Sequence, residues 1–236
     1  MHLRYTEIDR DPTALGELVL RRYEAETGEV GYEITINGAF LMASHGAHSE
    51  TAMAALAHRR LQRPARDLRV LVGGLGAGHT LRAALDLAGV TRVVVAEIGA
   101  KMADWNRRYF AAVNGRAVDD PRTEVRVADL ADVLAAGRDA FDLLLLDVDN
   151  GPGWLAAPGN ARLYDAAGVR ACRDALRPGG VVAVWSPQPN PIFFAALKGV
   201  FPVAEEFDTT PLGQPLGEPG DAIYLAVRDA GAPTAQ

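Results

Sequence analysis

The sequence predicts an α/β fold with a mostly parallel, doubly wound sheet. From residue 68 onward, short apolar runs alternate with amphipathic segments, which is the order of strands and helices in such a fold. Some runs are apolar throughout, such as LLLL at 143–146, and this is typical of strands that helices cover on both faces. Four runs end in a glycine or an acid. Because open α/β sheets bind ligands at the carboxyl ends of their strands, we expect a site at that edge.

The N-terminal part of the chain has a different pattern, which predicts a small antiparallel β-unit. Residues 17–24 and 30–36 have the composition of strands. Asn37 and Gly38 then separate the second strand from another apolar run. An Asn-Gly pair favours a tight hairpin turn, because both of its positions need a positive φ.

The remaining elements follow from their start and stop signals. Ser49 is expected to cap a helix that runs to about Gln62 and ends before Pro64. Further strands are predicted at 68–73, 92–97, 124–128, 142–147, 180–186, 202–208 and 222–228, and helices near 79–88, 100–113 and 161–176.

The composition argues against several classes of protein. The 236 residues, 49% of them hydrophobic, are enough for one main domain and a small appendage. The net charge of −6 argues against a nucleic-acid partner, which usually needs a basic face. A single cysteine, Cys172, excludes a disulfide within the chain and a cysteine-rich metal site. No apolar run reaches the roughly 18 residues of a membrane span. The polar N-terminus is unlike a signal peptide, so we expect a cytoplasmic protein with no membrane partner.

A glycine-rich turn follows the first predicted strand of the main sheet. Gly74, Gly76 and Gly78 permit positive φ angles and let a ligand approach the backbone closely. The fingerprint of dinucleotide-binding proteins needs glycine or alanine at its sixth position, which is His79 here, so a dinucleotide is disfavoured. A tight turn without any ligand is the alternative interpretation.

Acidic residues end the next three strands of the predicted sheet. Glu97 ends the second strand, at a spacing from the glycine turn that suits an acid accepting both ribose hydroxyls. Asp129 suits an adenine amino group, although an N-cap of the following segment explains it equally well. Asp147 and Asp149 follow a strongly apolar strand and are expected to face the cleft, with a structural loop cap as the alternative.

Metal binding is not expected at these acids. Paired carboxylates can hold a metal ion, but no histidine stands at a useful spacing from them. His45, His48 and His79 are scattered along the chain, and each is expected to be non-catalytic.

Five collinear motifs carry a resemblance to one protein family, and the resemblance runs from about Asn37 to Arg228. They read GLGAGHTLR (74–82), EIGAKMADWNRRYF (97–110), DPRTEVRVADL (120–130), FDLLLLD (141–147) and LRPGGVVAVWS (176–186). They resemble, in order, the motifs GGGDGG followed by LRE, EIDxxVxxxxRKYF, DPRxxVxxGDG, YDVIIxD and LKPGGxxxxQS. The chain therefore resembles the spermidine synthase family, the polyamine aminopropyltransferases.

The resemblance implies a methyltransferase-like Rossmann domain that binds S-adenosyl compounds. By position, Glu97 would hold the ribose and Asp129 the adenine, with Leu130 beside it, and Asp147 would match the catalytic aspartate. The co-substrate would be S-adenosylmethionine or its decarboxylated form, with no tightly bound cofactor. The acceptor would be a small amine of polyamine biosynthesis. A homodimer is a further expectation, because the small β-domain of the family often makes dimers.

Several positions depart from the family pattern. Ala77 replaces the aspartate of the glycine turn, which in the family faces the aminopropyl amine. The second aspartate and the proline of the family's DSxDP loop fall on Asn150 and Gly151, and Asp149 is a candidate to replace that aspartate. An aromatic residue of the family falls on Glu50.

Three functions follow, in order of preference. The first is transfer of an aminopropyl group from decarboxylated S-adenosylmethionine to an amine. The second is a small-molecule methyltransferase using intact S-adenosylmethionine, which Ala77 favours because a carboxylate there would repel the methionine carboxylate. The third is a non-catalytic nucleoside-binding protein, against which the retained Asp147 argues. The predicted organisation is a small β-unit over 1–47, a nucleoside-binding domain over 48–229 and a disordered tail over 230–236.

Overall fold

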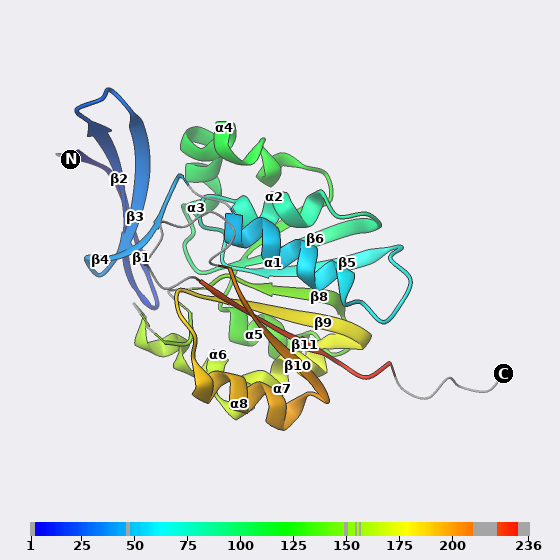
Figure 1. The fold of residues 1–236 in the computed structure, drawn as a ribbon. Helices are drawn as coiled ribbons and strands as arrows, with labels where there is room; N and C mark the ends of the chain where they lie inside the picture. The colour runs from blue at the N-terminus through cyan, green and yellow to red at the C-terminus, as the bar shows by residue number, and fades with distance from the viewer. Residues whose placement is uncertain are drawn as a thin grey trace.

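Two β-sheets organise the chain. The computed structural model describes residues 3–45, 48–148, 151–153, 155, 157–209 and 221–230. A small antiparallel sheet lies at the N-terminus, and a larger, mostly parallel sheet carries the helices (Figure 1). The α/β fold with a mostly parallel, doubly wound sheet is confirmed. Nearly all of the predicted tail, 230–236, lies outside the described residues.

The N-terminal sheet has four strands in sequential antiparallel order. They are β1 (Leu3–Thr13), β2 (Gly16–Ala25), β3 (Val30–Ile36) and β4 (Ala39–Ala43). The sequence pattern does not predict β1, because most of its side chains are polar and at least partly exposed. The hairpin turn between β3 and β4 is confirmed, since Asn37 and Gly38 have φ angles of 51° and 81°.

The larger sheet has the strand order β10-β11-β9-β8-β5-β6-β7. Its strands are β5 (Leu68–Gly73), β6 (Val90–Glu97), β7 (Thr123–Val127), β8 (Phe141–Leu146), β9 (Leu176–Ser186), β10 (Val203–Asp208) and β11 (Ala222–Val227). The first five of these run parallel, while β11 and β10 pair antiparallel at one edge. Every residue of β8 is buried, as its run of leucines predicts.

The register of the sheet brings four strand ends together. Gly73, the last residue of β5, pairs with Ala96 of β6 on one side and with Leu146 of β8 on the other. Glu97 pairs in turn with Val127 of β7. The residues that follow β5, β6, β7 and β8 therefore meet at one edge, as expected for parallel strands.

Helices cover both faces of the larger sheet (Figure 1). One face is covered by α1 (His48–Arg59), α2 (His79–Leu85), α3 (Met102–Trp105), the π-helix η1 (Asn106–Phe110) and α4 (Ala111–Asn114). The other is covered by α5 (Leu130–Ala136), α6 (Ala161–Tyr164), α7 (Ala166–Ala175) and α8 (Pro191–Val200). Alternate residues of β5 point to the two faces, with Val70 and Val72 in one core and Leu71 in the other. None of the helices in the described part of the chain is long and apolar enough to span a membrane.

Several predicted helix boundaries are wrong. The first helix begins at His48, so Ser49 lies inside it, and the Ser49 hydroxyl donates to Glu50 instead of capping. The predicted helix over 161–176 is interrupted at Asp165, whose carboxylate accepts the backbone N–H groups of the next turn and caps α7. Neither α5 nor α8 is predicted, because α5 has only 7 residues and the apolar residues of α8 do not repeat with a clear helical period.

Candidate active site

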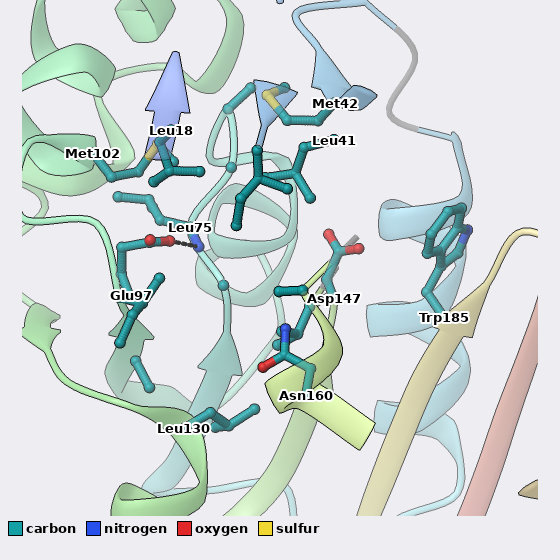
Figure 2. A pocket seen from close by; sticks show the side chains of 18 of the residues that line it. Leu18, Leu41, Met42, Leu75, Glu97, Met102, Leu130, Asp147, Asn160 and Trp185 are labelled. Atoms are coloured by element: carbon teal, nitrogen blue, oxygen red, sulfur yellow. Dashed lines mark hydrogen bonds between the residues drawn. The ribbon is translucent and has the colours of Figure 1, made fainter. Parts of the chain in front are cut away.

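A cavity of about 320 Å³ lies at the carboxyl edge of the larger sheet. The N-terminal sheet forms its roof, with Leu18, Leu41 and Met42 pointing toward the strand ends (Figure 2). Sequence-predicted site residues that line it are Gly74, Gly76, Glu97, Asp129, Leu130 and Asp147. Gly78 is buried and is not among the residues that line the cavity. Asp149 lies outside the described residues.

The glycine turn after β5 has the backbone conformation that its sequence predicts. Gly74, Gly76 and Gly78 have φ angles of 80°, 48° and 84°. A Cβ atom on Gly74 would lie 2.6 Å from the carbonyl oxygen of Asp147. Glycine at this position therefore lets the turn pass directly against the end of β8, where Asp147 enters the cavity.

Two buried asparagines donate hydrogen bonds to backbone carbonyls of this turn. The Asn106 amide donates to the carbonyl of Gly76 at 2.8 Å, and the Asn114 amide donates to the carbonyl of Ala77 at 2.8 Å. The Asn114 amide also donates to Asn106 Oδ1 at 2.7 Å, and both side chains are 1% exposed. A Cβ atom on Gly78 would meet both amides at 2.7 Å. We call Asn106 and Asn114 the amide pair, and no sequence motif predicts its role.

Removal of Asn114 from the amide pair is expected to destabilise the protein. In Asn114→Ala, the carbonyl of Ala77 and Oδ1 of Asn106 lose a buried donor, and each unsatisfied group costs about 1–3 kcal/mol. Urea unfolding should therefore show a loss of about 2–4 kcal/mol. Val113→Ala, on an exposed position of the same helix, is the control and should change stability by less than about 0.5 kcal/mol. Equal stability of the two variants would contradict this role.

Glu97 ends β6 and is 5% exposed. Its Oε2 accepts the backbone N–H of Leu75 at 2.8 Å, shown as a dashed line in Figure 2, and its Oε1 accepts the N–H of Gly99 at 2.7 Å. Burial raises the pKa of this carboxyl, while the hydrogen bonds from the backbone oppose that rise. A carboxylate offers about four lone-pair positions, so Glu97 still has capacity for two further donors from a ligand.

Asp129 lies at the end of β7, on the border between the cavity and α5. Its Oδ1 accepts the N–H of Ala131 at 2.9 Å, so the N-cap role considered from the sequence is present. Its Oδ2 forms an ion pair with Arg162 of α6. Arg162 is a residue that sequence analysis does not single out. Asp129 therefore faces the cavity with one oxygen fixed by the helix and the other bound by a guanidinium.

Asp147 follows β8, and its carboxyl is one of the groups that line the cavity (Figure 2). Its Oδ2 accepts the hydroxyl of Thr80 at 2.6 Å. Burial, followed by the nearby charge of Glu50, raises the pKa of Asp147 to about 7. An acid with such a pKa can exchange a proton near neutral pH, which is suited to general acid–base chemistry.

Three further titratable side chains line the cavity with Asp147. Glu50 of α1 lines the cavity and accepts the hydroxyl of Ser49 at 3.0 Å, and burial raises its pKa. His79 opens α2 and also lines the cavity. Burial lowers the pKa of His79, and its Nε2 atom is buried without a hydrogen-bond partner among the described residues. His45 lines the cavity too, with a ring nitrogen 2.9 Å from the hydroxyl of Tyr23.

In the described part of the chain, no group of three or more His, Cys, Asp or Glu side chains could hold a metal ion.

Comparison with known proteins assigns the family. The model of the spermine/spermidine synthase domain matches residues 50–191, which is more than half of the chain. The chain belongs to the spermine/spermidine synthase family. The matched segment begins at Glu50 and includes the glycine turn, Glu97, Asp129 and Asp147.

Curated relatives support this membership. The chain is 32% identical over 147 residues to a polyamine aminopropyltransferase of Nitrosomonas europaea, covering 59% of this chain and 43% of the relative. It is 27% identical over 231 residues to one of Synechococcus sp., covering 89% and 68%. The chain thus spans about half the length of several of the relatives it matches, such as 43% and 51% of two of them.

Solved structures confirm the fold. A spermidine synthase in complex with the transition-state analogue AdoDATO has a TM-score of 0.76 and 18% identity, covering 95% of this chain and 74% of that one. Human methyltransferase-like protein 13 in complex with SAH has a TM-score of 0.55 and 22% identity, covering 80% and 84%. Both have the fold that the sequence predicts for this chain.

The main departure from the family motifs lies in the glycine turn. Ala77 is 3% exposed and lines the cavity at the position where the family motif has an aspartate. Its carbonyl is bound by the amide pair, so the backbone of the turn is held although the acid is missing.

Proposed function

We propose that this protein binds an S-adenosyl nucleoside in the cavity and transfers the aminopropyl group of decarboxylated S-adenosylmethionine to a small amine. The single observation that carries the proposal is Asp147, a carboxyl with a pKa raised to about 7, placed directly against the glycine turn. Family membership supports the same reaction. The neighbouring wall is mostly apolar, which suits the body of a nucleoside.

The nucleoside is proposed to lie along the strand ends of β5, β6 and β7. Glu97 would accept the ribose hydroxyls with the lone pairs that Leu75 and Gly99 leave free. Adenine would lie against the apolar wall next to Asp129, where Leu130 contributes a side chain. The sulfonium end would then point toward Asp147, on the other side of the glycine turn.

The proposed reaction is a direct displacement at carbon. The neutral amine nitrogen of the acceptor attacks the propyl carbon next to sulfur, a C–N bond forms as the C–S bond breaks, and sulfur leaves as the thioether of methylthioadenosine. The new ammonium then loses one proton. Because the sulfonium is already activated, the protein mainly aligns the amine behind the carbon. Asp147 would orient the amine and accept its proton, directly or through water.

Ligand binding tests this proposal before any product is sought. Methylthioadenosine and decarboxylated S-adenosylmethionine at about 100 times their dissociation constants should each stabilise the protein by about 2.7 kcal/mol. For a chain of this size that corresponds to a rise in Tm of roughly 5–10 °C, measurable by differential scanning fluorimetry. Adenosine diphosphate at the same concentration is the control and should have no comparable effect. Absence of a shift with both S-adenosyl ligands would contradict the proposed site.

Methyl transfer is the second candidate, and one observation favours it. At Ala77 the cavity lacks the carboxylate that would repel the carboxylate of intact S-adenosylmethionine. If methyl transfer is the function, intact S-adenosylmethionine should raise Tm more than the decarboxylated form does. The opposite order is expected for aminopropyl transfer.

A further inference from the structure

We propose that Glu50 and Asp147 together bind a primary ammonium group of the substrate, and that Glu50 thereby replaces the acid missing at position 77. This inference deepens the proposed function and rests on it. Glu50 reaches the cavity from α1, whereas position 77 lies in the glycine turn after β5. The two positions belong to different elements of the fold, but both line the same cavity.

The charged side chains that line the cavity favour the binding of a cationic ligand. Among the described residues that line it, the acids are Glu50, Glu97, Asp129 and Asp147, and none is a lysine or arginine. Two of these acids already have charged or backbone partners in the protein, since Glu97 accepts two backbone N–H groups and Asp129 pairs with Arg162. In the described residues, neither Glu50 nor Asp147 forms an ion pair, and each has only hydroxyl or backbone donors.

The two remaining acids, Glu50 and Asp147, line the same cavity. The charge of Glu50 contributes to the raised pKa of Asp147, after burial. Asp221, which precedes β11, adds negative charge near both acids. Burial lowers the pKa of His79 and so disfavours a positive charge there, while the nearby charge of Asp147 acts in the opposite direction. Two carboxylates that line one mostly apolar cavity are stabilised by a bound cation.

The chemistry of the pair favours an ammonium over a metal ion. No group of three or more His, Cys, Asp or Glu side chains that could hold a metal ion occurs in the described part of the chain. A primary ammonium has three N–H donors, so it can bridge two carboxylates and still donate to a third acceptor. Both substrates of the proposed reaction carry such a group, namely the aminopropyl arm of the donor and the distal amine of a diamine acceptor.

Calorimetric titration of Glu50→Gln tests the inference. This substitution removes the charge of Glu50 but keeps its size and an acceptor for Ser49. Glu205→Gln is the matched control, because Glu205 pairs with Arg60 and does not line the cavity. The ligands are methylthioadenosine, which lacks an ammonium, decarboxylated S-adenosylmethionine, and putrescine titrated with and without saturating methylthioadenosine.

In Glu50→Gln, affinity for at least one ammonium ligand should fall by about tenfold or more, because a charge-assisted hydrogen bond is lost. Affinity for methylthioadenosine should stay within about twofold, and Glu205→Gln should leave all affinities unchanged. Loss confined to the decarboxylated donor would assign the ammonium to the aminopropyl arm. Loss confined to putrescine would assign it to the acceptor. Unchanged affinity for both ammonium ligands, or an equal loss for methylthioadenosine, would overturn the inference.

A second measurement on the native protein covers the case in which the variant does not fold. Binding of an ammonium between the two acids should release protons near pH 7, because a positive neighbour lowers the pKa of both carboxyls. Titrations in two buffers of different ionisation enthalpy measure the number of protons released on binding. They should show proton release with putrescine or decarboxylated S-adenosylmethionine and none with methylthioadenosine. Equal proton release for the two ligands would overturn the inference. If methylthioadenosine does not bind at all, the proposed nucleoside site fails, whereas proton release with putrescine alone would still support the ammonium site.

Discussion

Replacement of Asp147 by asparagine is expected to lower turnover by about 10²- to 10⁴-fold, the range typical for loss of a general base. Affinity for methylthioadenosine should change little, because Asp147 faces the reacting amine in the proposed arrangement. Asparagine keeps an acceptor for the Thr80 hydroxyl, so the local structure should survive. Steady-state rates with decarboxylated S-adenosylmethionine and an amine, together with calorimetric titration of methylthioadenosine, measure the two effects separately.

The pH dependence of turnover should report the same residue. A general base works in its ionised form, and the pKa of Asp147 is raised to about 7. Turnover of the native protein should therefore increase as the pH rises through about 7, and this step should be absent from the residual activity of Asp147→Asn. Asp86→Asn, which removes an exposed partner of Arg82, is the control and should keep both the rate and the profile. A near-normal rate in Asp147→Asn would exclude Asp147 from the mechanism.

Stability should change in the opposite direction to activity. The pKa of Asp147 is higher in the folded protein than its ordinary value of 3.8, so the folded state binds the proton more tightly. This contribution to stability is lost as the pH rises from about 4 to about 7. At pH 8, ligand-free Asp147→Asn should be more stable than the native protein by about 1–3 kcal/mol, and at pH 4 the difference should largely vanish. Destabilisation of the variant at pH 8 would favour the structural loop cap.

Glu97→Ala is expected to have the second large effect, on nucleoside binding. Loss of charged hydrogen bonds to the ribose should weaken methylthioadenosine binding by about 1.5–3 kcal/mol, or roughly 10- to 150-fold. The substitution also leaves the N–H groups of Leu75 and Gly99 without their acceptor, so the free energy of unfolding should fall. Calorimetry on the folded variant, well below its Tm, separates binding from stability.

Glu124→Gln provides the control for Glu97. Glu124 lies on the adjacent strand β7 and forms ion pairs with Arg92 and Arg126 away from the cavity, so nucleoside affinity should not change. If folded Glu97→Ala binds methylthioadenosine with the native affinity, the ribose assignment is wrong. A parallel loss in Asp129→Ala would support the placement of adenine at the end of β7.

The sequence predicts the site residues that follow the strands, because their positions depend on local sequence patterns. The glycine turn, Glu97, Asp129 and Asp147 each follow an apolar strand, and parallel strands deliver such residues to one edge. Their spacing along the chain is therefore sufficient to place them together. The N-cap role of Asp129 is also accessible to sequence analysis, since it depends only on the following turn.

The sequence does not predict the residues whose role depends on packing between distant elements. Asn106 and Asn114 reach the glycine turn only because η1 and α4 pack beside it, and a π-helix has no simple sequence signature. Glu50 aligns with an aromatic position of the family, so its carboxylate in the cavity becomes apparent only in the folded chain. Arg162 pairs with Asp129 across 33 residues, a contact that no local pattern encodes.

Product analysis by mass spectrometry tests the central claim most directly. The purified protein would be incubated with decarboxylated S-adenosylmethionine and putrescine, and in parallel with intact S-adenosylmethionine and putrescine. The account predicts methylthioadenosine and the N-aminopropylated amine in equal amounts from the first mixture, with Asp147→Asn forming little of either. Formation of S-adenosylhomocysteine and a methylated amine from the second mixture, without aminopropyl transfer in the first, would contradict it.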